Sequence, residues 1–523
     1  MRLLTPLLLT ATLFVPPPQR PAAFQLEEAT IARVHAAMKA GSLTCTGLVG
    51  QYLDRIEAHD KRGAALNAIT VVNPEARQQA AALDQQYKTS GPAGPLHCVP
   101  FIVKDNFETI GMQTAAGSLA LEDFDPGRDA FQVKRIKDAG AIIVAKSNMA
   151  EWAFSPYETV NSVLPGYTRN PYALDRVTAG SSGGTAAAVA ANFGLAGLGS
   201  DTGNSIRGPS SHQALVGIRS TMGLTSRAGV VPLSMLADIA GPMMRTVEDA
   251  VAVFAVIVGE DPNDPITLTK DFEPAGLRPA GRPQGTVDYR AALIRGGLKG
   301  ARIGVLRQAY ERDTTDAEVV KVFIAALEDL KNGGAIIVDP VRVEGLTEIR
   351  RSRDAGSCGG FKHDINRYLA SLGDRVPVKT LEEVIRSRRF HPSIESRLTS
   401  AQAGSENGLD SPACKAEADY RERYRVAVTE AMKTHDIQAF VYPTWSNPPR
   451  LIGDLNTPHG DNSQVFSPTT GWPSIQVPMG YTRDGRLPAG ITFFGRAWDE
   501  ATLITFAYDY EQTTKHRRPP PLR

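Results

Sequence analysis

Ser181, Ser182 and Ser205 are the side chains of this sequence best placed for nucleophilic chemistry, because all three lie in one run of small residues, 180–210. A tight Ser/Gly cluster opens the run, and the Ala-rich stretch 185–192 predicts a closely packed helix. A second Gly/Ser turn, which carries Ser205, follows. Small residues allow backbone N–H groups to approach a reacting carbonyl closely. Hydroxyls on turns at the two ends of one helical segment can meet in space, so the run needs only a base.

Lys104 is the candidate base. It follows 101–103, an apolar run that predicts a short buried strand, and an amine at the end of such a strand is poorly solvated. Desolvation disfavours the ammonium form and lowers the pKa, so the amine can accept a proton near neutrality. Lysine is a recognised replacement for histidine as the base of a serine nucleophile. Taken alone, Lys104 is better explained as a strand-end residue that reaches water or pairs with Asp105.

Together these segments resemble the amidase signature family, whose catalytic set is a serine, a second serine in a cis peptide, and a lysine. The resemblance runs from about 44 to 520, nearly the whole mature chain, with the serine spacing intact, and such a match is highly specific. The matching stretches are 95–106 (PLHCVPFIVKDN), 145–153 (AKSNMAEWA), the Gly/Ser run, 217–234 (GIRSTMGLTSRAGVVPLS), 240–250 (AGPMMRTVEDA) and 491–503 (ITFFGRAWDEATL).

The resemblance implies a role for each matching residue. Ser205 would be the nucleophile, Ser181 the cis-peptide serine that relays the proton, and Lys104 the base. The oxyanion hole would consist of four consecutive backbone N–H groups, those of Thr202, Gly203, Asn204 and Ser205. The implied activity is hydrolysis of the C–N bond of a small-molecule or peptide amide through an acyl-enzyme, without a cofactor.

The resemblance also implies the fold and the surroundings of the site. We expect one large α/β domain over 24–523, with a central twisted mixed β-sheet covered by helices on both faces. Three segments, 148–154, 357–368 and 466–472, would surround the acyl group. Asp201 and Arg207 flank the nucleophile turn, and we interpret them as a pair that braces it.

Asn204 departs from the family pattern, in which this position is usually glycine. Asparagine is the non-glycine residue that best tolerates a left-handed backbone, so we expect the turn to be kept. The added side chain would narrow the substrate site or contribute a donor. Ala179 and Cys98 also replace glycines that are common in the family.

Three other functions compete with this hypothesis. First, 180–184 matches G-x-S-x-G, so Ser182 would be the nucleophile of an α/β-hydrolase with His459 or His516 as base. That arrangement requires a buried strand before the serine, whereas 170–179 is polar and turn-like. Second, the chain would be a non-catalytic binding protein that kept the scaffold; the presence of both serines and the lysine argues against it. Third, it would be the amidase-like subunit of a transferase that acts on aminoacyl-tRNA.

Composition limits the possible partners. The chain has 523 residues, 42% hydrophobic and 22% charged, as is ordinary for a globular enzyme. Its formal net charge is +1 and it has no basic block, so we expect neither nucleic acid nor an anionic membrane surface as partner. The nine histidines include no HExxH or other metal-ligand spacing, and we expect no metal site.

The N-terminal residues 1–23 have the pattern of a secretory signal peptide: one basic residue, a short apolar core and a small-residue end, with cleavage after Ala23. The apolar stretch is shorter than the ~20 residues that span a bilayer. We therefore expect a secreted or periplasmic protein with no membrane span. An uncleaved anchor or an unprocessed cytoplasmic tail remains the alternative.

Four cysteines, Cys45, Cys98, Cys358 and Cys414, are an even number in a chain with a signal-like N-terminus. They allow one or two disulfides, and the sequence does not separate the three connectivities. We favour four small buried residues without a bond, because a fold of this size does not need covalent links.

Overall fold

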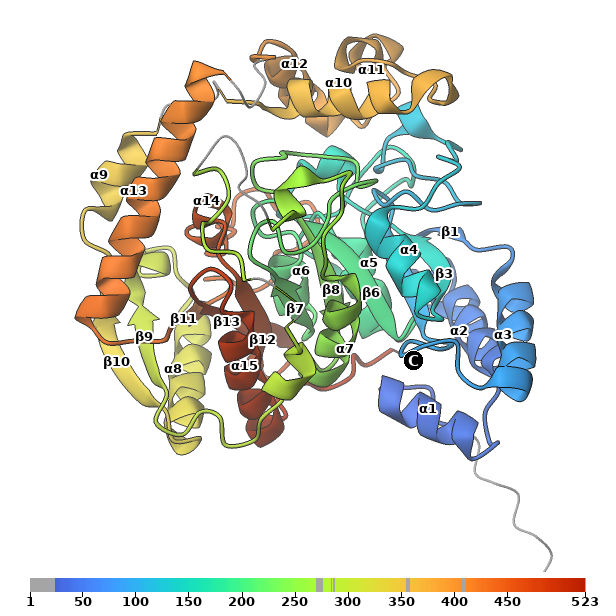
Figure 1. Ribbon diagram of the computed structural model, residues 1–523, viewed down its shortest axis with the longest axis horizontal. Coiled ribbons are helices and arrows are strands. Elements are labelled where there is room, and N and C mark those ends of the chain that lie inside the picture. Colours follow the sequence, from blue (N-terminus) through green and yellow to red (C-terminus); the bar gives the residue numbers. More distant parts are fainter. Residues whose placement is uncertain are drawn as a thin grey trace, which may run out of the picture.

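The computed structural model describes residues 24–269, 276–283, 285, 287–353, 358–406 and 411–522. The predicted signal peptide, 1–23, lies outside the described residues. An eleven-stranded mixed sheet forms the centre of the molecule, and helices cover both of its faces (Figure 1). The expected fold, one large α/β domain with a central mixed sheet, is confirmed.

Eleven strands lie side by side in the central sheet. Their spatial order is β1 (Ile69–Val72), β3 (Ile142–Ser147), β2 (Pro100–Lys104), β6 (Ala196–Asp201), β8 (Ile239–Met244), β7 (Val216–Arg219), β12 (Ser474–Thr482), β13 (Leu487–Phe494), β11 (Ala439–Pro443), β9 (Arg302–Leu306) and β10 (Ile336–Val341). A separate two-stranded sheet consists of β4 (Arg169–Asn170) and β5 (Ala173–Val177).

Strand direction changes along the sheet, and the change determines where side chains meet. β3, β2 and β6 run parallel to one another, as do β10, β9 and β11, and the remaining neighbours are antiparallel. Because parallel strands end at the same edge of a sheet, the residues at the ends of β2 and β6 lie close together. These residues are Lys104 and Asp201.

Helices form a layer on each face of the sheet. α5 (Gly183–Ala190) packs against β2 and β6, and it contacts α6 (Arg207–His212), which packs against β12 and β13. The other layer contains α4 (Phe131–Asp138), α7 (Val247–Ile257), α15 (Glu500–Thr514) and α8 (Ala317–Asn332). The first helices of the described chain are α1 (Ile31–Lys39), α2 (Cys45–His59) and α3 (Ala76–Ser90).

The run of small residues forms α5 as its composition predicts. Every residue of this helix is buried, and a Cβ added to Gly184 would lie 2.2 Å from the carbonyl oxygen of Asn148. Only a residue without a side chain allows this approach, so the Ala/Gly composition brings the helix directly onto the sheet. The observed helix, Gly183–Ala190, begins two residues before the predicted stretch.

A group of helices from the second half of the chain lies at one end of the molecule, at the top of Figure 1. It consists of α10 (Phe361–Ser371), α11 (Leu381–Ser387) and α12 (Glu395–Gln402), and we call it the cap. α9 (Leu346–Arg351) and the long α13 (Pro412–Thr434) lie beside it, whereas α14 (Ser467–Thr470) lies nearer the sheet. The Phe361 ring contacts Trp152 and Phe154, with ring centroids 6.0 and 4.7 Å apart, and so packs the cap onto the segment that follows β3.

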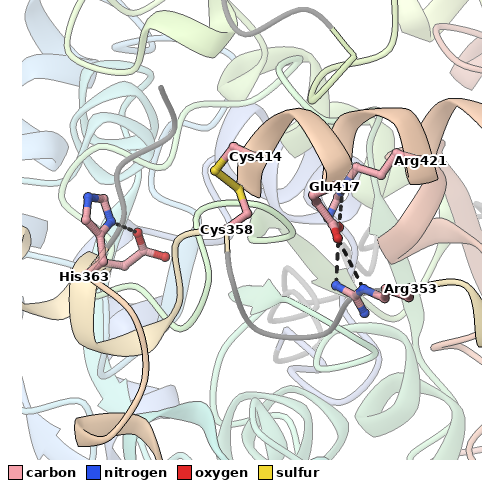
Figure 2. Close-up of a disulfide and its surroundings, with 7 residues drawn as sticks. Arg353, Cys358, His363, Cys414, Glu417 and Arg421 are labelled. Atoms are coloured by element: carbon pink, nitrogen blue, oxygen red, sulfur yellow. Dashed lines mark hydrogen bonds and ion pairs between the residues drawn. A yellow bond between two sulfur atoms is a disulfide. The ribbon is translucent and has the colours of Figure 1, made fainter. Parts of the chain in front are cut away.

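The cysteine prediction is wrong, because the structure contains two disulfides, Cys45–Cys98 and Cys358–Cys414. The second joins the residue just before the cap to the beginning of α13, just after it (Figure 2). This bond therefore links the two ends of the cap. Near it, Arg353 and Arg421 both pair with Glu417. Sequence reasoning could not bring the two cysteines together, since they are 56 positions apart.

Candidate active site

Lys104 is the centre of a buried polar cluster at the end of β2. Its side chain is 0% exposed, and Nζ lies 2.7 Å from Ser181 Oγ and 2.8 Å from Ser200 Oγ. Asn106 Nδ2 donates to the same Ser200 hydroxyl at 3.0 Å. Because β2 pairs in parallel with β6, the chain brings Lys104 and Ser200 together. The predicted meeting of Lys104 with Ser181 is confirmed, and the predicted cis peptide is present between Gly180 and Ser181.

Burial changes the protonation of Lys104. It lowers the pKa of this amine to about 7, while the negative charges of Asp238 and Asp201 oppose the shift. The alternative in which Lys104 pairs with Asp105 is wrong, because Asp105 lies 3.6 Å from the amine of a second buried lysine, Lys146. The Lys104 amine can therefore be neutral near pH 7, as a general base requires.

The turn that carries Ser205 is braced by a buried ionic cluster. Asp201 forms ion pairs with Arg207, at 3.0 Å, and with Arg219, at 2.9 Å, and all three side chains are 0% exposed. Burial alone would raise the pKa of Asp201, but the two guanidinium groups hold it at about 2. Arg207 also donates to the carbonyl of Gly203, at 2.6 Å. The interpretation of Asp201 and Arg207 as a bracing pair is confirmed, and Arg219 is an additional member.

The backbone of this turn leaves donors free. In the part of the chain that the structure describes, the N–H groups of Thr202, Gly203, Asn204 and Ser205 donate no hydrogen bond. Ser205 itself is 4% exposed, and its carbonyl accepts from the N–H of Ser182 at 3.3 Å, so the two serine turns are in contact. Four unused donors beside a serine are a suitable environment for a developing oxyanion.

Two residues of the cluster were not found by sequence reasoning. Ser200 precedes Ser205 by five positions, and it gave no signal because its strand neighbour was unknown. Asp238 accepts from Thr202 Oγ1 at 2.5 Å and from the N–H groups of Leu233 and Ser234. It therefore links the turn to the loop before β8, which no spacing in the sequence indicates.

The residues of the alternative hydrolase site are not brought together. Ser182 Oγ donates to the carbonyl of Ser200 at 3.2 Å. His516 bonds to Asp329, and His459 stacks on Tyr157. Moreover, the strand before Ser182 is β5, whose pattern is largely exposed and which belongs to the separate two-stranded sheet. The structure thus lacks, among its described residues, the buried strand that this alternative requires.

Asn204 is 0% exposed and lies close to Gly208 and Trp445. The expected left-handed backbone is wrong, since neither Asn204 nor Gly203 has a positive φ angle. An asparagine at this position therefore causes no backbone strain of that kind. Whether its side chain limits the size of the substrate stays a prediction.

The three segments expected around the acyl group differ in their positions. The first, 148–154, lies directly beside Ser181, because the N–H of Ala150 donates to the Ser181 carbonyl at 3.1 Å. The described part of the second, 358–368, meets the first through Phe361. In the third, the Phe466 ring packs in the core between Tyr424 and Phe494, so that part of the segment is structural.

The comparisons with known proteins agree with this geometry. The family model described as Amidase matches residues 47–504. A probable amidase of Arabidopsis thaliana is 33% identical over 95% of this chain and 92% of its own length. The amidase-like component of the glutamyl-tRNA(Gln) amidotransferase of Moorella thermoacetica is 34% identical over 90% of this chain and 93% of its own length.

A solved structure gives the same result. The native peptide amidase from Stenotrophomonas maltophilia has a TM-score of 0.82 and 35% identity, with 95% of this chain and 99% of that chain covered. Among the described residues, no helix is long and apolar enough to cross a membrane. The long match of family model, sequence and fold leads to one conclusion: this chain belongs to the amidase family and is a hydrolase of carbon–nitrogen bonds in linear amides.

Proposed function

We propose that this amidase works through an acyl-enzyme on Ser205, with Ser181 as proton relay and Lys104 as base. The observation that carries this proposal is the buried contact of 2.7 Å between Lys104 Nζ and Ser181 Oγ, next to the turn of Ser205. A neutral lysine is useful only where a proton must be accepted, and desolvation favours that form here.

In the first half of the reaction, Lys104 takes the proton of Ser181 while Ser181 takes that of Ser205. Ser205 Oγ then forms a bond to the amide carbon. The described hydrogen bonds do not include one from Ser181 to Ser205, and such bonds commonly tighten only when substrate is bound. The same relay in reverse gives the proton to the nitrogen as the C–N bond breaks, and water later removes the acyl group from Ser205.

The oxyanion would be held by the free N–H groups of residues 202–205. Preorganised donors of this kind stabilise the charge that develops on the carbonyl oxygen, and loss of one typically costs about 10²–10³-fold in kcat. The ion pairs of Asp201 with Arg207 and Arg219 support the proposal, because they restrain the residues that lead into and out of the turn.

For the substrate we propose the C-terminal amide of a peptide. The support is the likeness to the peptide amidase of Stenotrophomonas maltophilia, which covers nearly the full length of both chains. The likeness to amidotransferase subunits supports the second candidate, a subunit that acts on aminoacyl-tRNA.

A substrate panel distinguishes these candidates. The purified chain alone should release ammonia from peptide amides faster than from short aliphatic amides, aryl amides or carbamates. The matched control is the same peptide with a free C-terminal carboxylate, from which no ammonia is released. A chain that is inactive on every amide by itself, and active only when other subunits are added, would favour the transferase subunit.

We also propose that residues 1–23 direct export and are removed. The two disulfides support a location outside the reducing cytoplasm, where such bonds persist. The intact mass of the protein secreted by its native host should correspond to a chain that begins at Phe24 and lacks four hydrogens, two for each disulfide. A mass that includes 1–23, or four free thiols, would contradict the proposal.

A further inference from the structure

Gly208 leaves a space beside the nucleophile turn, and the side chain of Asn204 borders this space. The N–H of Gly208 donates to the carbonyl of Asn204 at 2.7 Å, so the two residues are one helical turn apart at the beginning of α6. A Cβ added to Gly208 would lie 2.7 Å from Asn204 Nδ2 and 2.8 Å from Trp445 Nε1. Both distances are shorter than real Cβ contacts allow, so any larger residue at 208 would displace these groups.

The side chain of Asn204 is enclosed by its neighbours. It is 0% exposed, and Trp445 is 4% exposed. The Trp445 ring is itself packed against His212, with ring centroids 4.7 Å apart, and against Tyr157, at 6.4 Å. Neither polar atom of the Asn204 side chain has a hydrogen-bond partner among the described residues. Packing, rather than a direct hydrogen bond to a described residue, therefore fixes its orientation.

We propose that Asn204 is a positioning residue for the oxyanion hole. Its side chain, packed against Gly208 and Trp445, holds the peptide groups that carry the N–H donors of Asn204 and Ser205. The inference rests on the proposed function, in which these donors bind the oxyanion. It differs from the expectation that the side chain limits substrate size, because it assigns no substrate contact to that side chain.

The physical reason is the precision that such a site demands. Donors stabilise the transition state only when they are held within about 0.5 Å of the productive position. Asp201 and its two arginines brace the turn through side chains at 201, 207 and 219 and through the carbonyl of Gly203. None of these described contacts involves the side chain of Asn204, so the packing against Gly208 and Trp445 is a separate restraint on the residue before the nucleophile.

The experiment is a double-mutant cycle of Gly208→Ala and Asn204→Gly. Each variant is assayed for kcat and KM on a peptide amide and for inhibition by the matching peptide aldehyde, whose serine adduct places an oxyanion in the hole. Gly208→Ala should lower kcat on the order of 10–100-fold and weaken the aldehyde by a similar factor, with KM within about threefold of the parent, since the lost stabilisation belongs to the transition state. Asn204→Gly should cause a smaller loss of the same kind.

The double variant gives the decisive result. Once the Asn204 side chain is gone, the methyl group introduced by Gly208→Ala no longer displaces it, so the double variant should have the kcat of Asn204→Gly alone. Losses that simply multiply would overturn the inference, because independent effects are additive in free energy. A wider acyl range for Asn204→Gly, with kcat on small amides and aldehyde affinity unchanged, would instead establish the size limit.

Two further variants guard against a purely structural effect. Ser211→Ala removes a buried hydroxyl of the same helix that has no hydrogen-bond partner among the described residues, and it should change neither kcat nor aldehyde affinity. If Gly208→Ala does not fold, Asn204→Ala empties the space without a clash, and it should still weaken the aldehyde; unchanged affinity there would overturn the inference. Labelling of Ser205 in the parent enzyme tests the proposed function separately from all these variants.

Discussion

Replacement of Lys104 by alanine is expected to lower kcat about 10²–10⁴-fold, the usual effect of removing a general base. The parent enzyme should become more active as the pH rises through about 7, where the ammonium of this buried residue loses its proton, and then reach a plateau. The alanine variant should lack that step. Lys104→Arg should not restore activity, because a guanidinium keeps its proton at these pH values. The measurement is kcat/KM against pH for the three proteins.

Lys146 provides a matched control for this experiment. It is also a fully buried lysine, burial lowers its pKa to about 8, and it donates to the carbonyls of Phe107 and Gln113. It makes no described contact with Ser181 or Ser205. Lys146→Met should therefore reduce stability while the pH step of the folded enzyme remains near 7. If the step disappears in Lys146→Met but persists in Lys104→Ala, the assignment of the base is wrong.

The sequence was sufficient for the parts of the site that depend on local pattern. Lys104 was found because it follows an apolar strand, and Ser181 and Ser205 because they lie in one run of small residues with a specific spacing. The same holds for the Asp201–Arg207 pair, whose members are six residues apart. In each case the chemistry is contained within a short segment or a family motif.

The remaining parts depend on contacts between distant segments. Ser200 bonds to Lys104 only because β2 and β6 are neighbours in the sheet, and Asp238 reaches Thr202 from a loop 36 positions later. The disulfides were missed for the same reason: Cys358 and Cys414 are brought to a Cα–Cα distance of 4.5 Å by the cap that lies between them. Sequence patterns of one chain carry no information about such pairings.

The Asn204 environment illustrates this limit most clearly. From the sequence, an asparagine in place of glycine indicates a turn with a left-handed residue and an added group in the substrate site. The structure shows an ordinary backbone and a buried side chain beside Gly208 and Trp445. The glycine four residues later was visible in the sequence, but Trp445 is more than 200 positions away, and only the fold shows that all three lie together.

Ser205→Ala is expected to have the largest effect of all, a loss on the order of 10⁶-fold in kcat, as when the serine nucleophile of a hydrolase is removed. The hydroxyl is the atom that bonds to the amide carbon, and none of the neighbouring groups can replace it. The variant should still fold, since Ser205 Oγ makes no hydrogen bond within the described part of the chain. A thermal unfolding curve close to that of the parent would verify this.

Labelling identifies the nucleophile directly. A fluorophosphonate probe should modify the parent enzyme at one serine, and mass spectrometry of the peptides should place the adduct on Ser205. Ser182→Ala is the matched control, because Ser182 lies in the adjoining turn and its hydroxyl bonds only to the Ser200 carbonyl among the described residues. That variant should still be labelled, whereas Ser205→Ala should not. An adduct on Ser182 in the parent would reverse the assignment and favour the hydrolase alternative, in spite of the exposed strand that precedes it.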